Sequence, residues 1–237
     1  MLASVIVPAL NEAENIEACI TAVRRDYAPE QVEIIVVDGG STDGTRGRVP
    51  SGVTLLRAPR GRAVQMNRGA AISRGEILAF CHADSRLPEG WREAVIEVLE
   101  RPGVSGGTFQ TVIVPPGSLV LWVRNHLAFP ANWRIMFGDQ VQFMTRDTFH
   151  RVGGFPEIPL MEDVEMSRAL NEIGELVRIR PSLRVTTSSR RFLERGPVFQ
   201  WLLNSWSMFR YLYRGATPED IARVYRSSRE EGLCDGS

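Results

Sequence analysis

Apolar segments that alternate with helical patterns dominate the first hundred residues of the chain. Strands are predicted at residues 4–7, 32–37, 53–56 and 77–81, and helices with one apolar face are predicted between them. Strands that are apolar throughout are typical of a parallel sheet with helices on both faces. The sequence therefore predicts an α/β fold with a mostly parallel sheet, followed by a C-terminal helical tail.

Polar residues stand where three of these strands end. Asn11 follows the first strand, Asp38 closes the second, and Asp84 follows the fourth. In open α/β sheets, ligands bind outside the carboxyl ends of the strands, so these three residues are expected to share one site. Asn11 also stands three residues before Glu14, which predicts that Asn11 caps the following helix.

Asp38 begins the glycine-containing segment 38–45. Glycines let a backbone turn tightly against a ligand, and a carboxylate there can accept a hydrogen bond from a ribose hydroxyl or a base N–H. The alternative is that Asp38 or Asp43 caps the next helix.

His82 and Asp84 are two residues apart in an extended segment, so their side chains are expected on the same side. A hard cation such as Mg²⁺ or Mn²⁺ takes one or two carboxylates and completes its shell with phosphate oxygens and water. The pair therefore predicts a metal site, with a simple strand-end cap as the alternative.

Two further groups of charged residues are candidates. Four arginines flank a glycine loop and the start of a helix, and Arg62, next to Gly61, is the best placed of them for a phosphate. Glu162 and Asp163 open a later helix, where either carboxylate could act as a general base. Favourable charge at a helix N-terminus is the structural alternative for this pair.

Composition excludes some classes of function. Lys plus Arg and Asp plus Glu both number 28, which disfavours a dedicated nucleic-acid binder. The three separated cysteines form neither a disulfide framework nor a zinc pattern and favour a reducing compartment. No window reaches the roughly 18 apolar residues of a membrane-spanning helix. We therefore expect a cytoplasmic protein that at most lies on the inner face of a membrane.

Taken together, the segments 7–12, 36–45, 82–85 and 162–163 resemble the family 2 glycosyltransferases, inverting enzymes with the GT-A (Rossmann-like) fold. The agreement in order and spacing extends over residues 3–190. Residues 61–67 and 188–192 further resemble a bacterial subgroup of small single-domain members. The resemblance implies transfer of one sugar from a nucleotide-sugar donor to a saccharide, lipid-linked or small-molecule acceptor, with a UDP-sugar as the first guess for the donor.

The resemblance also implies a role for each matched residue. Asp84 corresponds to the last Asp of the Asp-X-Asp motif that binds the divalent cation, and Asp163, or else Glu162, corresponds to the catalytic base. The nucleotide pocket would be lined by Pro8, Asn11, Glu12 and Asp38. His82 replaces the usual first Asp, which leaves metal affinity open. The Gln-X-X-Arg-Trp motif of processive synthases is absent, which favours one sugar per encounter.

Two other functions fit the same layout. A sugar-1-phosphate nucleotidyltransferase would carry a Gly-rich basic loop after the first strand, where this chain has residues 8–12. A non-catalytic nucleotide-sugar-binding protein would bind the donor without turnover. A Rossmann dehydrogenase is disfavoured, because no Gly-X-Gly-X-X-Gly follows the first strand.

The second half of the chain predicts strands at 108–114, 141–145, 177–179 and 184–187, and helices at 119–129 and 162–173. Residues 1–190 are predicted as the catalytic domain, with a nucleotide-sugar half at 1–100 and an acceptor half at 101–190. Residues 191–237 form the predicted helical extension. Its aromatic helix at 197–213 is expected to pack on the catalytic domain or a dimer partner, or else to lie on lipid.

Overall fold

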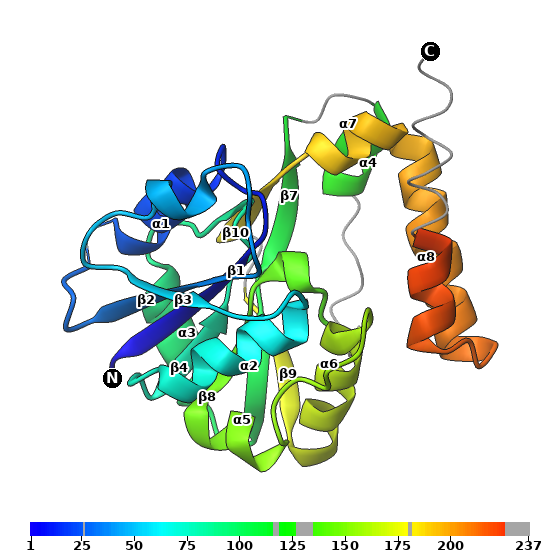
Figure 1. The fold of residues 1–237 in the computed structure, drawn as a ribbon. Coiled ribbons are helices and arrows are strands. Elements are labelled where there is room, and N and C mark those ends of the chain that lie inside the picture. The colour runs from blue at the N-terminus through cyan, green and yellow to red at the C-terminus, as the bar shows by residue number, and fades with distance from the viewer. Residues whose placement is uncertain (26, 116–118, 127–134, 180–181, 226–237) are drawn as a thin grey trace. The chain divides into compact units, whose positions relative to one another are not determined.

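The computed structural model describes residues 1–25, 27–115, 119–126, 135–179 and 182–225 (Figure 1). The chain divides into two compact units. The first comprises residues 1–112, 129–157 and 162–187, and the second comprises residues 113–128, 158–161 and 188–237. The predicted domain boundaries at residues 100 and 190 stay predictions.

The first unit contains a seven-stranded sheet with the strand order β3-β2-β1-β4-β8-β6-β9. β1 pairs in parallel with β2 and β4, and β2 pairs in parallel with β3. β8 runs antiparallel to both β4 and β6, whereas β6 and β9 are parallel. The strands are β1 (Ala3–Ala9), β2 (Val32–Asp38), β3 (Thr54–Arg57), β4 (Ile77–Phe80), β6 (Val104–Thr108), β8 (Gln142–Thr145) and β9 (Glu175–Arg178). The prediction of a mostly parallel sheet is confirmed.

Helices cover both faces of this sheet, as predicted. The apolar faces of α1 (Ile16–Arg24) and α3 (Trp91–Leu99) contribute to one buried cluster. The helices α2 (Arg62–Ile72), α5 (Arg146–Arg151) and α6 (Glu162–Ile173) contribute to a second cluster. Successive side chains of a strand point to opposite faces, so Val5 and Val7 of β1 join the first cluster and Ile6 joins the second.

The glycine-rich strand β6 was not predicted, because the predicted strand at 108–114 corresponds only to β7 (Gln110–Val114). Gly106 and Gly107 weaken the sequence signal of β6, yet the sheet requires them. A Cβ at Gly106 would lie 2.8 Å from the carbonyl oxygen of Phe143 on the neighbouring strand. Close approach of two backbones thus explains a strand built from poor strand formers.

Two further predictions differ from the structure. The strand predicted at 184–187, β10 (Arg184–Ser188), does not complete the main sheet but lies in a separate three-stranded sheet of order β5-β10-β7, with β5 at Ser85–Arg86. No helix was predicted between residues 145 and 162, but this segment contains α5, which Thr145 caps by accepting a hydrogen bond from the Thr148 N–H at 3.1 Å. Short elements of this kind carry too few residues to show a period.

The second unit contains α4 (Leu119–His126), α7 (Arg190–Arg195) and α8 (Pro197–Tyr213), and residues 218–225 are also helical. The prediction of a helix at 197–213 is confirmed. Of the helix predicted at 119–129, residues 127–129 lie outside the described residues. Among the helices that the structure describes, none is long and apolar enough to cross a membrane.

Candidate active site

The carboxyl ends of β2, β1 and β4 lie next to one another in the sheet, because β1 is the central strand of the three. Ala9, the last residue of β1, is level with Asp38 at the end of β2. Asn11 follows β1 and Asp84 follows β4, so the three predicted polar residues stand at one edge of the sheet. The chain connection reverses direction across the sheet at β1 and β4, which is where open α/β sheets bind ligands.

Asn11 joins the loop after β1 to the loop after β2. Its side-chain Oδ1 accepts a hydrogen bond from the Thr42 N–H at 2.9 Å, and its own N–H donates to Ser41 Oγ at 2.9 Å. Asn11 has a φ of 55°, a left-handed conformation that Asn tolerates better than most residues. The predicted cap was wrong, because α1 begins only at Ile16 and its N-cap residue is Asn15.

Glu12 is a buried carboxylate in the same pair of loops. Its backbone N–H donates to Thr45 Oγ1 at 2.8 Å, and its Oε2 accepts from Asn15 Nδ2 at 2.8 Å. The carbonyl oxygen of Glu12 also accepts from the backbone N–H groups of Asn15 and Ile16. Glu12 therefore fixes the start of α1 and the shape of the loop at once.

The carboxylate of Asp38 is fully buried beneath its own loop. It accepts hydrogen bonds from the backbone N–H of Ser41 at 3.1 Å and of Gly40 at 3.2 Å, and Arg46 Nε lies 3.9 Å from Oδ2. These contacts shape the loop, but Asp38 does not cap the helical turn η1 (Thr45–Arg48), whose N-cap residue is Gly44. Each carboxylate oxygen has more than one acceptor site, so a further donor from a nucleoside is chemically compatible.

Gln65 of α2 joins the ends of β1 and β2. Its Nε2 donates to the carbonyl oxygen of Ala9 at 2.9 Å and to that of Val37 at 2.7 Å. Gly39 lies directly against this amide, and a Cβ at Gly39 would be 3.0 Å from the Gln65 side chain. The position of α2, and with it of Arg62, is thereby tied to the strand ends.

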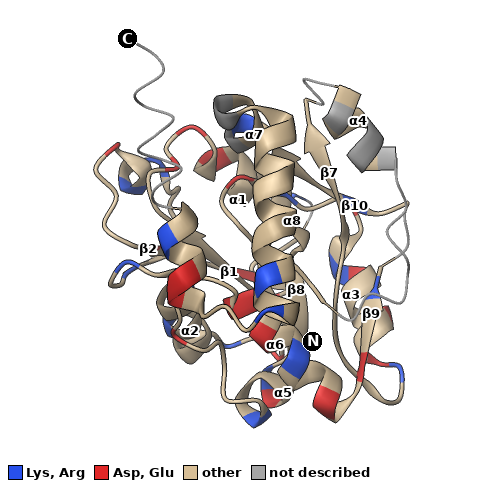
Figure 2. Cartoon of the chain, turned by 90° about the vertical axis from the view of Figure 1, so that its right-hand side faces the viewer, with Lys and Arg blue, Asp and Glu red and all other residues tan. Residues whose placement is uncertain are grey.

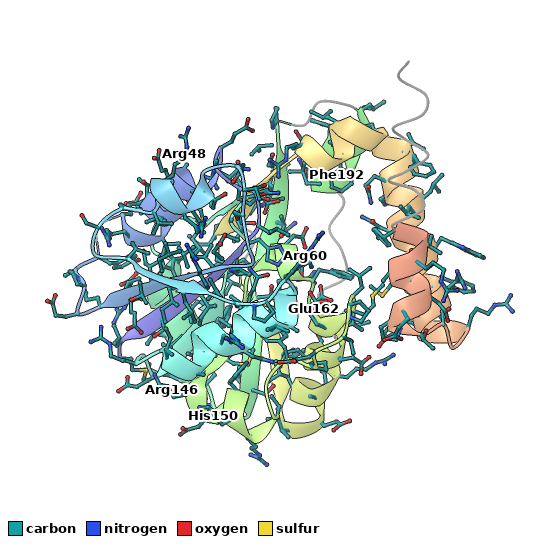
Figure 3. The ribbon with its side chains drawn as sticks, viewed as in Figure 1. Arg48, Arg60, Arg146, His150, Glu162 and Phe192 are labelled. Carbon is teal, nitrogen blue, oxygen red and sulfur yellow. The ribbon has the colours of Figure 1, made fainter. Side chains whose placement is uncertain are left out.

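Arg62, the first residue of α2, lies among acidic side chains. Its Nη1 is 3.2 Å from Oε1 of Glu162, which Figure 3 labels at the start of α6, beside the first turn of α2. Burial acts to lower the pKa of the Arg62 guanidinium, but four carboxylates raise it above its usual value. These carboxylates belong to Glu162, Asp163, Asp84 and Asp139. Arg62 thus lies near both Asp84, from the first hundred residues, and Glu162 and Asp163, from the second half of the chain.

The environments of the two adjacent carboxylates differ. Glu162 is almost fully buried and has the Arg62 ion pair, whereas Asp163 accepts backbone hydrogen bonds from Gly138 at 2.8 Å and from Val164 at 2.9 Å. Burial, with a smaller contribution from the charge of Glu162, raises the pKa of Asp163 to about 6, against the opposing effects of Arg62 and the two N–H groups. Such a carboxylate is ionised at neutral pH and remains a useful proton acceptor.

The side chain of His82 lies against the turn that holds Asp163. A Cβ at Gly138 would lie 2.8 Å from His82 Nε2 and 3.6 Å from Asp163 Oδ2, so Gly138 leaves room between them. Asp84 is mostly buried and close enough to Arg62 to influence its pKa. Within the described residues, no group of three or more His, Cys, Asp or Glu could hold a metal. The segment predicted as extended is a turn instead, because the Ser85 N–H donates to the His82 carbonyl oxygen at 3.0 Å. Carboxylate and imidazole groups remain of the ligand types that suit a cation sharing a diphosphate.

The model of glycosyl transferase family 2 matches residues 4–156, which include the loops that carry Asn11, Asp38 and Asp84. The chain belongs to glycosyl transferase family 2.

Two relatives show how much of the chain has known counterparts. ExoA of Rhizobium meliloti, a succinoglycan biosynthesis protein, is 48% identical over 192 residues, or 72% of this chain and 58% of ExoA. The glycosyltransferase AglE of Haloferax volcanii is 34% identical over 110 residues, or 43% of this chain and 36% of AglE. The chain therefore spans 58% or less of the length of these two relatives.

Solved glycosyltransferase structures share the fold. The mannosyltransferase PcManGT from Pyrobaculum calidifontis, in complex with GDP-Man and Mn²⁺, has a TM-score of 0.65 at 21% identity and covers 99% of this chain and 76% of its own. TarS residues 1–349 from S. aureus, in complex with UDP-GlcNAc, has a TM-score of 0.64 at 15% identity and covers 79% of this chain and 58% of its own. The predicted GT-A fold is confirmed.

Within this family 2 chain, all of the predicted site residues belong to the first unit. Four arginines flank the glycine loop. Arg62 lies close enough to several carboxylates for them to raise its pKa, whereas Arg57, Arg60 and Arg68 are exposed. The sequence reasoning missed Gly138 and Asp139, which form the short 3-10 turn η2 (Gly138–Gln140) beside Asp163. No apolar strand precedes this turn, so the pattern that identified Asp38 and Asp84 could not find it.

Proposed function

We propose that this chain transfers a single sugar from a nucleotide-sugar donor to an acceptor hydroxyl by one displacement with inversion, with the help of a divalent cation. The observation that carries the proposal is the cluster in which Arg62 joins Glu162 and Asp163 to Asp84 at the end of β4. It combines an ionisable base, a cation for phosphate and a candidate metal ligand. Family membership supports the same reaction.

In the proposed reaction, a bond forms between the acceptor oxygen and the anomeric carbon while the bond from that carbon to the nucleoside diphosphate breaks. Asp163 accepts the proton of the acceptor hydroxyl, which a carboxylate with a pKa of about 6 can do at neutral pH. The guanidinium of Arg62 compensates negative charge near the departing diphosphate.

A divalent cation, Mg²⁺ or Mn²⁺, would be held by Asp84 with His82 and would stabilise negative charge on the diphosphate. The mostly buried carboxylate of Asp84, in the same turn after β4 as His82, supports this assignment. PcManGT and another neighbour, GalNAc-T7, are described with Mn²⁺, which is a reason to test Mn²⁺ first.

The donor nucleotide would bind across the loops after β1 and β2, where Pro8, Asn11, Glu12 and Asp38 would line its pocket. The hydrogen bonds between these loops support a rigid, preformed site. A uridine nucleotide is our first choice, and the neighbours with UDP-GlcNAc and GDP-Man keep guanosine as the second. We further propose a cytoplasmic site of action and a saccharide, lipid-linked or small-molecule acceptor.

The decisive experiment combines calorimetry with turnover. UDP, GDP, dTDP and CDP are titrated with and without Mn²⁺, and release of nucleoside diphosphate is measured for the matching sugar nucleotides. Metal-dependent binding of one member together with release supports the proposal. Binding without any release would favour a non-catalytic nucleotide-sugar-binding protein, and release of pyrophosphate from a sugar 1-phosphate and a nucleoside triphosphate would favour a nucleotidyltransferase.

Two variants separate the base from the metal ligand. Asp163→Asn should retain donor affinity and lower turnover by roughly 100-fold or more, because the proton acceptor is lost. Asp84→Ala should weaken donor binding only when Mn²⁺ is present. Asp147→Asn, an exposed change of the same type on α5, is the matched control and should alter neither. Unchanged turnover in Asp163→Asn would remove Asp163 as the base.

A further inference from the structure

An apolar stripe runs along one side of α8 in the second unit. Seven large apolar side chains of this helix are between 41% and 74% exposed; Trp201 lies to one side, and the other six form the stripe. At about 100° of rotation per residue, they fall within an arc of about 100°. The members of this stripe are Val198, Phe199, Leu202, Trp206, Phe209 and Tyr213.

The buried side of α8 is mainly polar. Its buried residues are Gln200, Leu203 and Ser207, and Gln200 donates a hydrogen bond to Asn204 one turn later at 2.7 Å. A surface helix of a globular protein ordinarily turns its apolar side to the core and its polar side to water. In α8 this arrangement is reversed, so burial within the described structure does not account for the stripe.

The aromatic rings of the stripe are packed on one another. The ring centroids of Trp206 and Phe209 are 5.8 Å apart in a stacked arrangement, and those of Phe209 and Tyr213 are 5.6 Å apart. The guanidinium carbon of Arg214 lies 5.9 Å from the centroid of the Phe209 ring. The stripe is therefore a continuous aromatic surface with a cation at one end.

The charges of α8 are of one sign. From Pro197 to Arg214 the segment has no acidic residue, and its two charged residues are Arg210 and Arg214. Figure 2 shows α8 without red over its length and with blue toward one end. Tyr and Trp beside arginine are typical of helices that lie at the level of lipid headgroups.

A second copy of the chain would fit this stripe less well than a lipid surface. The helix has 17 residues and is about 25 Å long, so a stripe about 10 Å wide covers roughly 250 Å². A stable protein interface buries about 800 Å² per partner.

We propose that the α8 stripe docks on a bilayer that contains anionic lipid, with the aromatic rings among the headgroups and acyl chains and Arg210 and Arg214 next to lipid phosphates. Docking goes beyond the proposed reaction, and vesicle binding can be measured without turnover. For a transferase, such a surface would hold the enzyme near acceptors that are embedded in the membrane.

The test is flotation of the full chain with vesicles of phosphatidylcholine alone and of an equimolar mixture with phosphatidylglycerol. The double variant Trp206→Ser, Phe209→Ser should lower partition onto the mixed vesicles at least about tenfold, the effect expected for burial of one aromatic side chain. The matched control is Leu55→Ser, Ile72→Ser, which removes two exposed apolar side chains of the first unit and should float as the original chain does. Circular dichroism and nucleotide binding verify that both variants are folded.

The charge component has its own pair of variants. Arg210→Gln, Arg214→Gln should weaken binding to the mixed vesicles several-fold, and salt at about 0.5 M should do the same, because headgroup charges are then screened. Arg101→Gln, Arg151→Gln removes two exposed arginines of the first unit and should have little effect. Equal binding to neutral and mixed vesicles, without salt dependence, would contradict the role of the arginines.

Two results would overturn docking as a whole. One is absence of binding to the mixed vesicles by folded protein. The other is a lipid-free dimer, seen by sedimentation, that the Trp206→Ser, Phe209→Ser change dissociates. Asp163→Asn should float as the original chain does, so a failure of the catalytic proposal is recognised separately from a failure of docking.

Discussion

The ion pair between Arg62 and Glu162 makes a specific prediction for the pH dependence of transfer. Arg62 is the cation that opposes the rise in the pKa of Asp163, which burial and Glu162 bring to about 6. Arg62→Gln leaves two adjacent carboxylates, of which Glu162 is buried and Asp163 partly buried, without that cation. Loss of a neighbouring opposite charge changes a carboxyl pKa by about 1 unit or more, so we expect the apparent pKa of Asp163 to reach about 7.

The size of the effect follows from the ionised fraction of Asp163. At pH 6 about half of the original enzyme has an ionised base, compared with about one tenth of the variant, so activity falls about fivefold. At pH 8 the base is almost fully ionised in both proteins. Any contribution of Arg62 to phosphate binding lowers activity at both pH values, and the ratio of activities at pH 6 and pH 8 removes it.

The assay is kcat/KM for nucleoside diphosphate release between pH 5 and pH 9 at saturating Mn²⁺. Arg60→Gln is the matched control, because Arg60 is exposed and lies two residues before Arg62 (Figure 3). Its acid limb should stay near pH 6. An acid limb at the same pH in Arg62→Gln and in the original enzyme would refute the assignment of this limb to Asp163.

Three other substitutions test the site and its support. Gly138→Ala places a Cβ 2.8 Å from His82 Nε2 and should displace the imidazole. Nucleotide affinity in the presence of Mn²⁺, measured by calorimetry, should then fall at least tenfold. An unchanged effect of Mn²⁺ on this affinity would count against His82 as a ligand. Asn67→Ala removes the two hydrogen bonds, 2.8 and 2.9 Å long, that hold the backbone of Phe155. The free energy of unfolding measured in urea should fall by about 1–3 kcal/mol, and a smaller fall would mean that water replaces the two bonds. The pKa of Asp163 is about 6 in the folded protein and 3.8 in the unfolded chain, so ionisation of Asp163 lowers stability as pH rises between these values. Asp163→Asn removes this loss and should raise the unfolding free energy by about 1–3 kcal/mol at pH 8 but not at pH 4. Equal changes at both pH values would contradict this linkage.

The sequence predicted the parts of the fold that depend on regular, buried elements. β1, β2 and β4 are mainly apolar; Asp38 closes β2, and Asn11 and Asp84 follow β1 and β4 at the same edge of the sheet. Parallel pairing alone is sufficient to bring Asn11, Asp38 and Asp84 there. Their presence at one site could therefore be inferred without knowledge of a single side-chain contact.

Contacts between distant segments could not be predicted in this way. Nothing in the sequence around Gln65 indicates that its amide joins the carbonyl groups of Ala9 and Val37. The same holds for the turn at Gly138, whose N–H meets Asp163 only because η2 and α6 lie side by side in the fold. Periodicity describes one element at a time, whereas these contacts depend on how separate elements pack.

The neighbouring acids at the start of α6 show how one dipeptide can supply two different groups. Glu162 has a guanidinium within 3.2 Å and is nearly excluded from solvent, so its charge is matched and its side chain is held in place. Asp163 accepts hydrogen bonds from backbone N–H groups and feels Arg62 only through its charge, and burial raises its pKa to about 6. Pairs of titratable groups whose surroundings separate them in this way are typical of acid–base chemistry. A charge at a helix N-terminus would stabilise α6 with either acid, but it requires neither the burial of Glu162 nor the turn that holds Asp163. The arrangement therefore favours Asp163 as the proton acceptor and Glu162 as the residue that positions Arg62.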